Sequence, residues 1–211
     1  MVKRPKGVSG GLPRTGHFTF ARPALPGDYC ILLAPAQDAN LERLRRHQVD
    51  LQLMFGGRLP EPTHLTCNRF EVSAERIPDE DRIAALQHEL AIRLAKARPF
   101  SLKPVAYLPQ YSPLRYVHIL KWQVEADDNL RRMHELIEEA LDASGSMSLY
   151  PRGWVSTLVT ALEDIQSIKL DSQAVSVPLC NPLFTVGEVL ITHIRAQNDF
   201  RLITRLLVPT E

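Results

Sequence analysis

The sequence lacks any apolar run long enough to span a bilayer, and it is poor in cysteine. A transmembrane helix needs about 20 consecutive apolar residues, and no stretch of these 211 residues comes near that length. The three cysteines, Cys30, Cys67 and Cys180, are odd in number and show no C-x-x-C spacing. We therefore expect no membrane partner, and we expect the cysteines to be small core residues in a reducing compartment.

A strong net charge and the common cofactor motifs are also missing. The formal net charge is only +1, which gives no overall field to attract nucleic acid. There is no G-x-G-x-x-G stretch, no P-loop and no His/Cys cluster with zinc spacing. The run HELIE at 134–138 lacks the second histidine of a zinc-protease helix, so it predicts a solvated helix face with His134 on it. We expect neither a metal nor a cofactor.

Basic charge is concentrated near the N-terminus. Residues 1–26 hold five lysines and arginines and no acidic residue, mixed with glycine and proline, which predicts a flexible basic arm. This arm either contacts RNA or is only solvated. It lacks the apolar middle of a secretory signal, so we expect a cytoplasmic protein. Residues 27–211 are long enough for a single domain of two lobes, and we expect a monomer.

Apolar periodicity predicts a chain in which strands and helices alternate. Helices are expected after Asp38, over 77–98 and after Asp127 or Asp128, because each stretch carries an apolar stripe and ends at glycine or proline. Short apolar or β-branched runs bounded by turn residues predict the strands. These runs cover 27–35, the stretch around His64, 100–110, 114–125, 154–162, 184–194 and 200–208.

Two helix starts are alike: DANLERL at 38–44 and DDNLRRM at 127–133. Each is preceded and followed by a predicted strand, so the order strand, capped helix, strand occurs twice. A common helix-cap pattern alone would also explain the likeness. If His64 lies on the closing strand of the first unit, its counterpart should lie near residues 153–155.

The stretch His64-Leu65-Thr66-Cys67, approached by FGGRLPEPTHLT, resembles the first His-x-Thr motif of the 2H phosphoesterase superfamily. The stretches RPFSLKPVAYL and LFTVGEVLITHI are similar to two further strands of that superfamily. The superfamily includes the bacterial 2′-5′ RNA ligases and RNA 2′,3′-cyclic phosphodiesterases, and the likeness covers residues 27–208. It implies an α+β fold of two pseudo-symmetric lobes of antiparallel sheet, with outer helices around a central cleft.

The second His-x-Thr motif of the family is degenerate here. Its expected place holds Trp154-Val155-Ser156-Thr157-Leu158. Aligning Thr157 with the family threonine puts Val155 at the histidine position, whereas aligning Ser156 with it puts Trp154 there. Neither residue can move a proton, and both registers remain open.

The resemblance implies roles for the residues that match. His64 would be the retained acid or base, and Thr66 would bind a phosphate oxygen, since strand alternation sends both to one face. Thr157 or Ser156 would keep the second phosphate contact. His118 and His193 are candidates to replace the missing histidine, and a phosphate-binding groove has four candidate residues. These are Arg69, Arg115, Lys121 and Arg152.

The implied function is a hydrolase-like protein acting on 2′,3′-cyclic or 2′-5′ phosphodiesters of RNA ends or nucleotides, with reduced or lost activity. An alternative is a catalytically degenerate protein that binds RNA or a nucleotide without cleaving it. A third is an interaction module with an unused cleft.

Overall fold

The computed structural model describes residues 28–71, 79–112, 116–166, 170, 175–196 and 199–210. The predicted basic arm lies outside the described residues, and so do the first residues of the helix predicted over 77–98. The boundary between arm and domain therefore stays a prediction.

Nine strands within the described residues form one sheet, and every strand pair in it is antiparallel. Its order is β3-β8-β1-β2-β7-β5-β4, with β6 paired to β2 and β9 paired to β8. The strands are β1 (Tyr29–Pro35), β2 (Leu65–Glu71), β3 (Phe100–Ser101), β4 (Pro104–Ser112), β5 (Val117–Val124), β6 (Met147–Ser148), β7 (Leu158–Ile165), β8 (Thr185–Ala196) and β9 (Asp199–Leu207).

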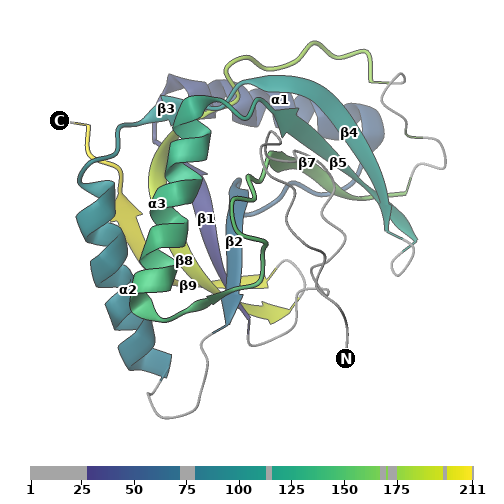
Figure 1. The fold of residues 1–211 in the computed structure, drawn as a ribbon. Coiled ribbons are helices and arrows are strands. Elements are labelled where there is room, and N and C mark those ends of the chain that lie inside the picture. Colours follow the sequence, from purple (N-terminus) through teal and green to yellow (C-terminus); the bar gives the residue numbers. More distant parts are fainter. Residues whose placement is uncertain are drawn as a thin grey trace, which may run out of the picture.

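The sheet consists of two lobes that meet between β2 and β7 (Figure 1). One lobe contains β3, β8, β1 and β2 with the added strands β6 and β9, and the other contains β7, β5 and β4. The register between the lobes is set by one pair, Leu65 with Val159. This arrangement confirms the predicted α+β fold of two antiparallel lobes.

The described residues form three helices, α1 (Ala39–Phe55), α2 (Asp79–Leu94) and α3 (Asp128–Ser144). The Asp38 carboxylate accepts hydrogen bonds from two backbone N–H groups of the first turn of α1, both at 3.0 Å. Asp127 caps α3 in the same way, through the N–H of Leu130 at 2.9 Å. These caps satisfy donors that the helix itself leaves unpaired. None of the described helices is long and apolar enough to cross a membrane.

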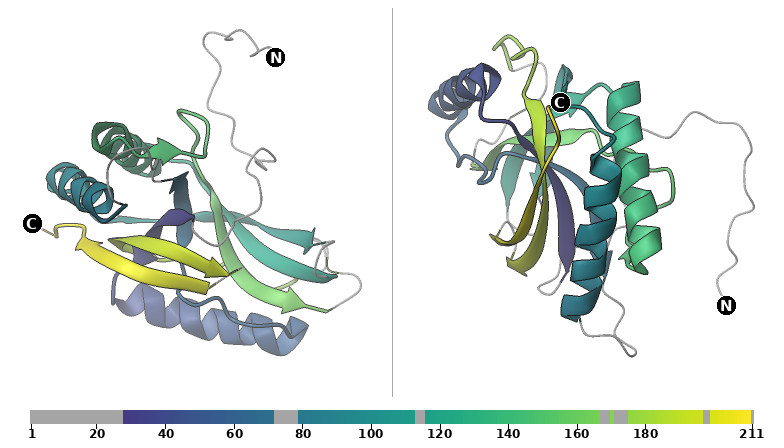
Figure 2. Two further views of the ribbon diagram at one scale, coloured as in Figure 1. Left: turned by 90° about the horizontal axis from the view of Figure 1, so that it is seen from below. Right: turned by 90° about the vertical axis from the view of Figure 1, so that its left-hand side faces the viewer.

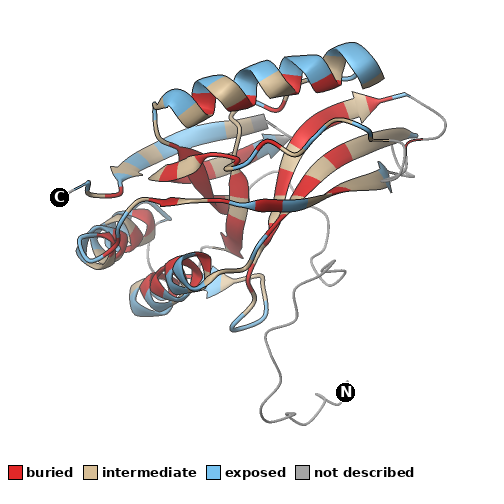
Figure 3. Cartoon of the chain, turned by 90° about the horizontal axis from the view of Figure 1, so that it is seen from above, coloured by how far each residue is buried: buried red, intermediate tan, exposed pale blue. Residues whose placement is uncertain are grey.

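The helices cover the sheet from two sides. Helices α2 and α3 lie side by side, and α1 lies on the other side of the strands, against β7 (Figure 2). Each helix turns buried residues toward the strands and exposed ones outward (Figure 3). The stripe predicted for α2 is buried as expected. Burial of each such leucine side chain contributes about 2 kcal/mol to folding.

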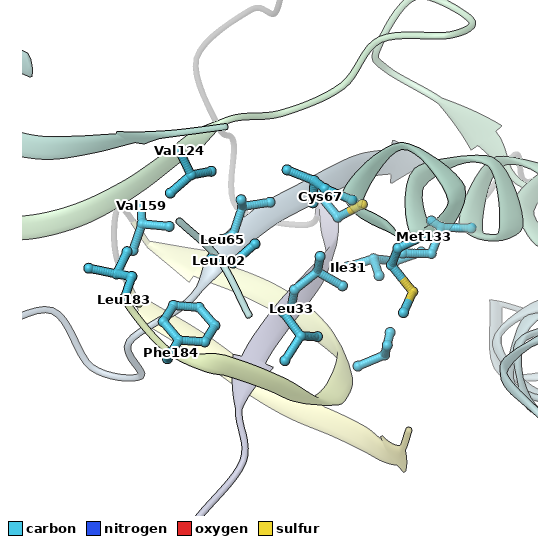
Figure 4. Packing of buried hydrophobic residues seen from close by; sticks show 14 of the residues in the cluster. Ile31, Leu33, Leu65, Cys67, Leu102, Val124, Met133, Val159, Leu183 and Phe184 are labelled. Atoms are coloured by element: carbon cyan, nitrogen blue, oxygen red, sulfur yellow. The ribbon is translucent and has the colours of Figure 1, made fainter. Parts of the chain in front are cut away.

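One large hydrophobic core extends across both lobes. Leu65, Val124 and Val159 lie together in it, near Leu183 and Phe184 (Figure 4). Alternate residues of β1 point into a second, smaller cluster on the opposite face of the sheet. That cluster contains Cys30, Leu32, Ala34, Leu190 and Ile194, with Phe200 packed against it. All three cysteines are buried free thiols, which confirms the prediction that they are core residues.

The order strand, helix, strand occurs twice, as β1-α1-β2 and β5-α3-β7, with β6 inserted before β7. The strand predicted to begin at residue 154 begins at Leu158 instead. The prediction followed an apolar run, but pairing decides where a strand starts, and β5 ends its pairing with β7 at Gln123 and Leu158. Just before β7, Val155 lies in the large core and Thr157 is also buried.

A loop ties the approach to His64 onto β7. The backbones of Arg58 and Glu163 exchange two hydrogen bonds, at 2.7 and 2.8 Å. Gly57 precedes this pair with a φ of +87°, and a Cβ placed there would lie 2.4 Å from the Glu163 carbonyl oxygen. The neighbouring Gly56 also has a positive φ, of +68°, but a Cβ there would meet nothing within 4 Å. Of these two glycines, only Gly57 is therefore required by close packing as well as by backbone conformation.

We expect Gly57→Ala to destabilise the protein more than Gly56→Ala does. Both substitutions put an L-residue at positive φ, which costs about 1 kcal/mol, and the overlap at Gly57 adds about 1–3 kcal/mol. Urea unfolding of the two variants measures this difference. Equal losses of unfolding free energy would show that the contact with β7 is unimportant.

Candidate functional site

His64 directly precedes β2, and the register of β2 sets the direction of its neighbours. Leu65 is buried in the large core beside Val159. Successive residues of a strand point to opposite faces, so His64 and Thr66 lie on the face away from that core. Both are half-buried, which leaves them accessible to a ligand.

The same reasoning applies to the neighbouring strands, because paired residues of an antiparallel ladder share a face. Leu158 and Thr160 flank Val159 and so point to the face of His64. Lys121 of β5 pairs with Thr160 and joins them. We name this surface the His64 face; it carries His64, Thr66, Leu158, Thr160 and Lys121.

The two lobes are related here by a local two-fold axis through the Leu65 and Val159 pair. That axis takes His64 to Leu158 and Thr66 to Thr160. The counterpart of His64 thus lies later in the chain than the predicted 153–155, and it is an aliphatic side chain. Thr160 is the hydroxyl that corresponds to Thr66.

The residues predicted for the second motif all lie before β7. Thr157 is 4% exposed, and its carbonyl oxygen accepts a hydrogen bond from Val124 N–H at 2.8 Å. Ser156 is half-buried. Trp154 lines a small pocket of about 170 Å³ against α3, and Val155 is in the core. Geometry therefore favours Thr160 over Ser156 and Thr157 as the partner of Thr66.

The His64 ring is held by its own loop. His64 Nδ1 lies 2.6 Å from the Pro62 carbonyl oxygen. Since a carbonyl can only accept, Nδ1 carries the proton, and Nε2 of the neutral ring is left with a free lone pair. The Phe200 ring meets the imidazole edge-on, with centroids 5.3 Å apart.

Burial lowers the pKa of His64 below its usual 6.5, the hydrogen bond to Pro62 opposes this shift, and the positive charge of Lys121 lowers the pKa further. The imidazole is therefore neutral at physiological pH and able to accept a proton.

Lys121 is a half-buried cation with one acidic neighbour, Glu163. Burial lowers the pKa of its ammonium group, and the negative charge of Glu163 raises it in part. Glu163 is itself held by Arg58, whose Nη2 donates to Glu163 Oε2 at 2.7 Å. This arrangement puts a cation and an imidazole on the same face.

Neither histidine proposed as a substitute reaches the His64 face. His193 pairs with Tyr29 of β1, four residues before Leu33, which pairs with Leu65. Residues an even number of positions apart on a strand point to the same face, so Tyr29 and its partner His193 lie on the same side of the sheet as Leu65. Its ring packs on Tyr29 with centroids 4.9 Å apart.

His118 fails for the same reason. It lies four residues before Trp122, which pairs with Val159 in the large core. His118 therefore points to the core side of β5, and its ring packs against Tyr111, with centroids 5.1 Å apart. The hypothesis that His118 or His193 supplies the missing imidazole is wrong in this geometry.

His134 is buried, so the prediction of a solvated helix face at HELIE is wrong for this residue. The α3 periodicity turns it inward beside Met133, and its Nδ1 lies 3.2 Å from the Cys67 sulfur. Burial lowers the pKa of His134 to about 4 and raises the pKa of Cys67 well above its usual value. The two groups are therefore neutral at pH 7, and Cys67, which lies in the large core, faces away from His64.

A groove of about 740 Å³ adjoins the loop before His64. Its walls include Pro62, the small-cluster residue Leu190, and three arginines. The arginines are Arg45, Arg58 and Arg205.

Two of the arginines predicted to line a groove have other partners. Arg69 forms a buried ion pair with Asp28 at 3.1 Å, and Arg152 is exposed and pairs with Asp142. Arg115 lies outside the described residues. No group of three or more His, Cys, Asp or Glu residues in the described ranges could hold a metal ion.

Sequence reasoning missed Thr160 and the place of Lys121 beside it. A signal for Thr160 was present, since Leu158-Val159-Thr160-Ala161 repeats the pattern of His64-Leu65-Thr66-Cys67 with leucine in place of histidine. Nothing comparable marks the position of Lys121, because that position depends on pairing with Thr160.

No protein-family model matches the chain, and no curated protein matches it. Solved structures do resemble it. The structure of E. coli LigT complexed with 3′-AMP covers 87% of this chain and 99% of its own, with 15% sequence identity and a TM-score of 0.55. A phosphoesterase structure gives the same coverage and identity, with a TM-score of 0.56.

The structure of TT0787 from Thermus thermophilus covers 86% of this chain and 97% of its own, with 17% identity and a TM-score of 0.51. Structural matches at such low sequence identity show a shared fold alone. The chain has the fold of LigT and the 2H phosphoesterases.

Proposed function

We propose that this protein hydrolyses 2′,3′-cyclic or 2′-5′ phosphodiesters of RNA ends or nucleotides. The observation that carries the proposal is the state of His64, whose Nδ1 donates to Pro62 and whose Nε2 is left free to accept a proton. Thr66 shares its face, and Thr160 is the related hydroxyl across the lobe boundary. A proton acceptor beside two hydroxyl donors suits a phosphodiester.

In the reaction with a 2′,3′-cyclic phosphate, a water oxygen bonds to phosphorus and its proton passes to His64 Nε2. The bond from phosphorus to one ribose oxygen then breaks, and that oxygen takes up a proton. Thr66 and Thr160 donate hydrogen bonds to the nonbridging oxygens, where negative charge increases in the transition state. Leu158 cannot supply the second proton.

Nucleotide chemistry is supported by the structural relatives. E. coli LigT has been crystallised with 3′-AMP and with NADP+, and both contain phosphate esters of adenosine. Free buried thiols at all three cysteines support a reducing, cytoplasmic setting. We therefore propose that the protein is a cytoplasmic monomer that acts on RNA ends or nucleotides.

One observation favours a second function, binding without cleavage. Leu158 occupies the position related to His64, so the imidazole pair of the fold is incomplete. Loss of one member of an acid/base pair lowers the rate by about 10²–10⁴. A protein that holds a phosphodiester through Thr66 and Thr160 would still bind RNA ends.

We expect His64→Ala to lower hydrolysis of adenosine 2′,3′-cyclic phosphate by at least about 10² relative to wild type, because the general base is removed. His118→Ala and His193→Ala are matched controls and should keep wild-type rates. Tight binding of the cyclic phosphate without turnover by the wild type would favour the binding function. Equal rates of hydrolysis by His64→Ala and wild type would contradict the role of His64 as general base.

We expect Thr160→Val to weaken the site and Thr157→Val to leave it intact. Loss of a hydrogen bond to a charged phosphate costs about 1.5–3 kcal/mol, which is a 10- to 150-fold loss in kcat/KM. Steady-state kinetics on the cyclic phosphate compares the two isosteric variants. If Thr157→Val instead had the larger effect, the second hydroxyl would come from Thr157, before β7, and not from Thr160 on β7.

A further inference from the structure

Lys121 lies one strand beyond Thr160 on the His64 face. Continuing the Leu65 register by one residue places His64 across from Thr160, so the three residues form a row over β2, β7 and β5. Neighbouring strands lie about 4.8 Å apart, which separates the backbones of His64 and Lys121 by about 10 Å. Both side chains rise from the same face, so a phosphodiester bound above this row would lie within reach of both.

The ammonium group is available to a ligand. Among the described residues Lys121 forms no ion pair, and its acidic neighbour Glu163 is already engaged by Arg58 at 2.7 Å. Burial, which lowers the pKa of Lys121, also makes it a better proton donor than a solvated lysine. The negative charge of Glu163 opposes this lowering of the pKa.

We propose that Lys121 is the general acid of the site and protonates the leaving ribose oxygen in place of the missing second imidazole. This inference rests on the proposed hydrolysis. As the phosphorus–oxygen bond breaks, the leaving oxygen takes a proton from Lys121 Nζ, while His64 Nε2 has taken one from the attacking water. Exchange with solvent then returns a proton to Lys121 and removes one from His64, so the cycle balances.

The test compares two substrates that differ in their need for an acid. A ribose alkoxide needs protonation to leave, whereas the p-nitrophenolate of bis(p-nitrophenyl) phosphate does not. Lys121→Met should lower kcat/KM for adenosine 2′,3′-cyclic phosphate by about 10² or more, and for the p-nitrophenyl diester by less than about tenfold. Because both values come from one preparation, misfolding cannot produce the contrast. Lys103→Met, at an exposed lysine beside Glu125, is the matched control and should behave as wild type.

Lys121→Arg separates charge from proton transfer. Arginine keeps the positive charge but cannot release its proton near neutral pH, so this variant should keep KM and lose kcat on the cyclic phosphate. Wild-type kcat in Lys121→Arg, or equal losses on both substrates in Lys121→Met, would overturn the inference while leaving the hydrolase intact. Absence of turnover by the wild type would instead overturn the proposed function, and the role of Lys121 with it.

Discussion

The pairing of Leu65 with Val159 is the contact on which the arrangement of the site depends. It joins the two lobes and buries both side chains in the core that α1, α2 and α3 cover. Because residues alternate along each strand, this pair also decides that His64, Thr66 and Thr160 share the opposite face. A shift of one residue would turn Thr160 into the core and bring Val159 to the surface.

The fold is close to symmetric, but the chemistry on its two halves is not. Across the local two-fold axis, His64 corresponds to Leu158, and only the hydroxyl partners Thr66 and Thr160 are retained. The face nevertheless carries a second group able to bear a proton, because β5 adds Lys121 beside Thr160. The positive charge on this face thus comes from Lys121 of β5, and not from Leu158, the position related to His64.

The tautomer of His64 follows from its loop. The Pro62 carbonyl fixes the Nδ1 proton, and the loop that presents Pro62 is anchored to β7 through the backbone bonds between Arg58 and Glu163. The side chains of the same two residues form the ion pair that positions Glu163 near Lys121. One loop therefore supports both His64 and Lys121.

Local features of this fold could be predicted from the sequence, and long-range register could not. The caps at Asp38 and Asp127 and the apolar stripe of α2 depend on residues within a turn or two, so the pattern reveals them. The direction of His64 and Thr66 follows from strand alternation alone. The places of Thr160 and Lys121 depend on which strands pair and where, which tertiary packing decides. The apolar run from Trp154 hides the true start of β7 for the same reason.

We propose that His64 is the neutral, Nδ1-protonated imidazole of a nucleotide site, and ¹⁵N NMR of the histidine rings tests this directly. A titration of the full chain between about pH 5 and 8, with and without 3′-AMP, reports the pKa, the tautomer and the ligand contact of each ring. We expect His64 to titrate below its usual 6.5, to carry its proton on Nδ1, and to shift at Nε2 when 3′-AMP is added. The ring signals of His118 and His193 should not shift when 3′-AMP is added. A His64 ring protonated on Nε2 and indifferent to 3′-AMP would contradict the account.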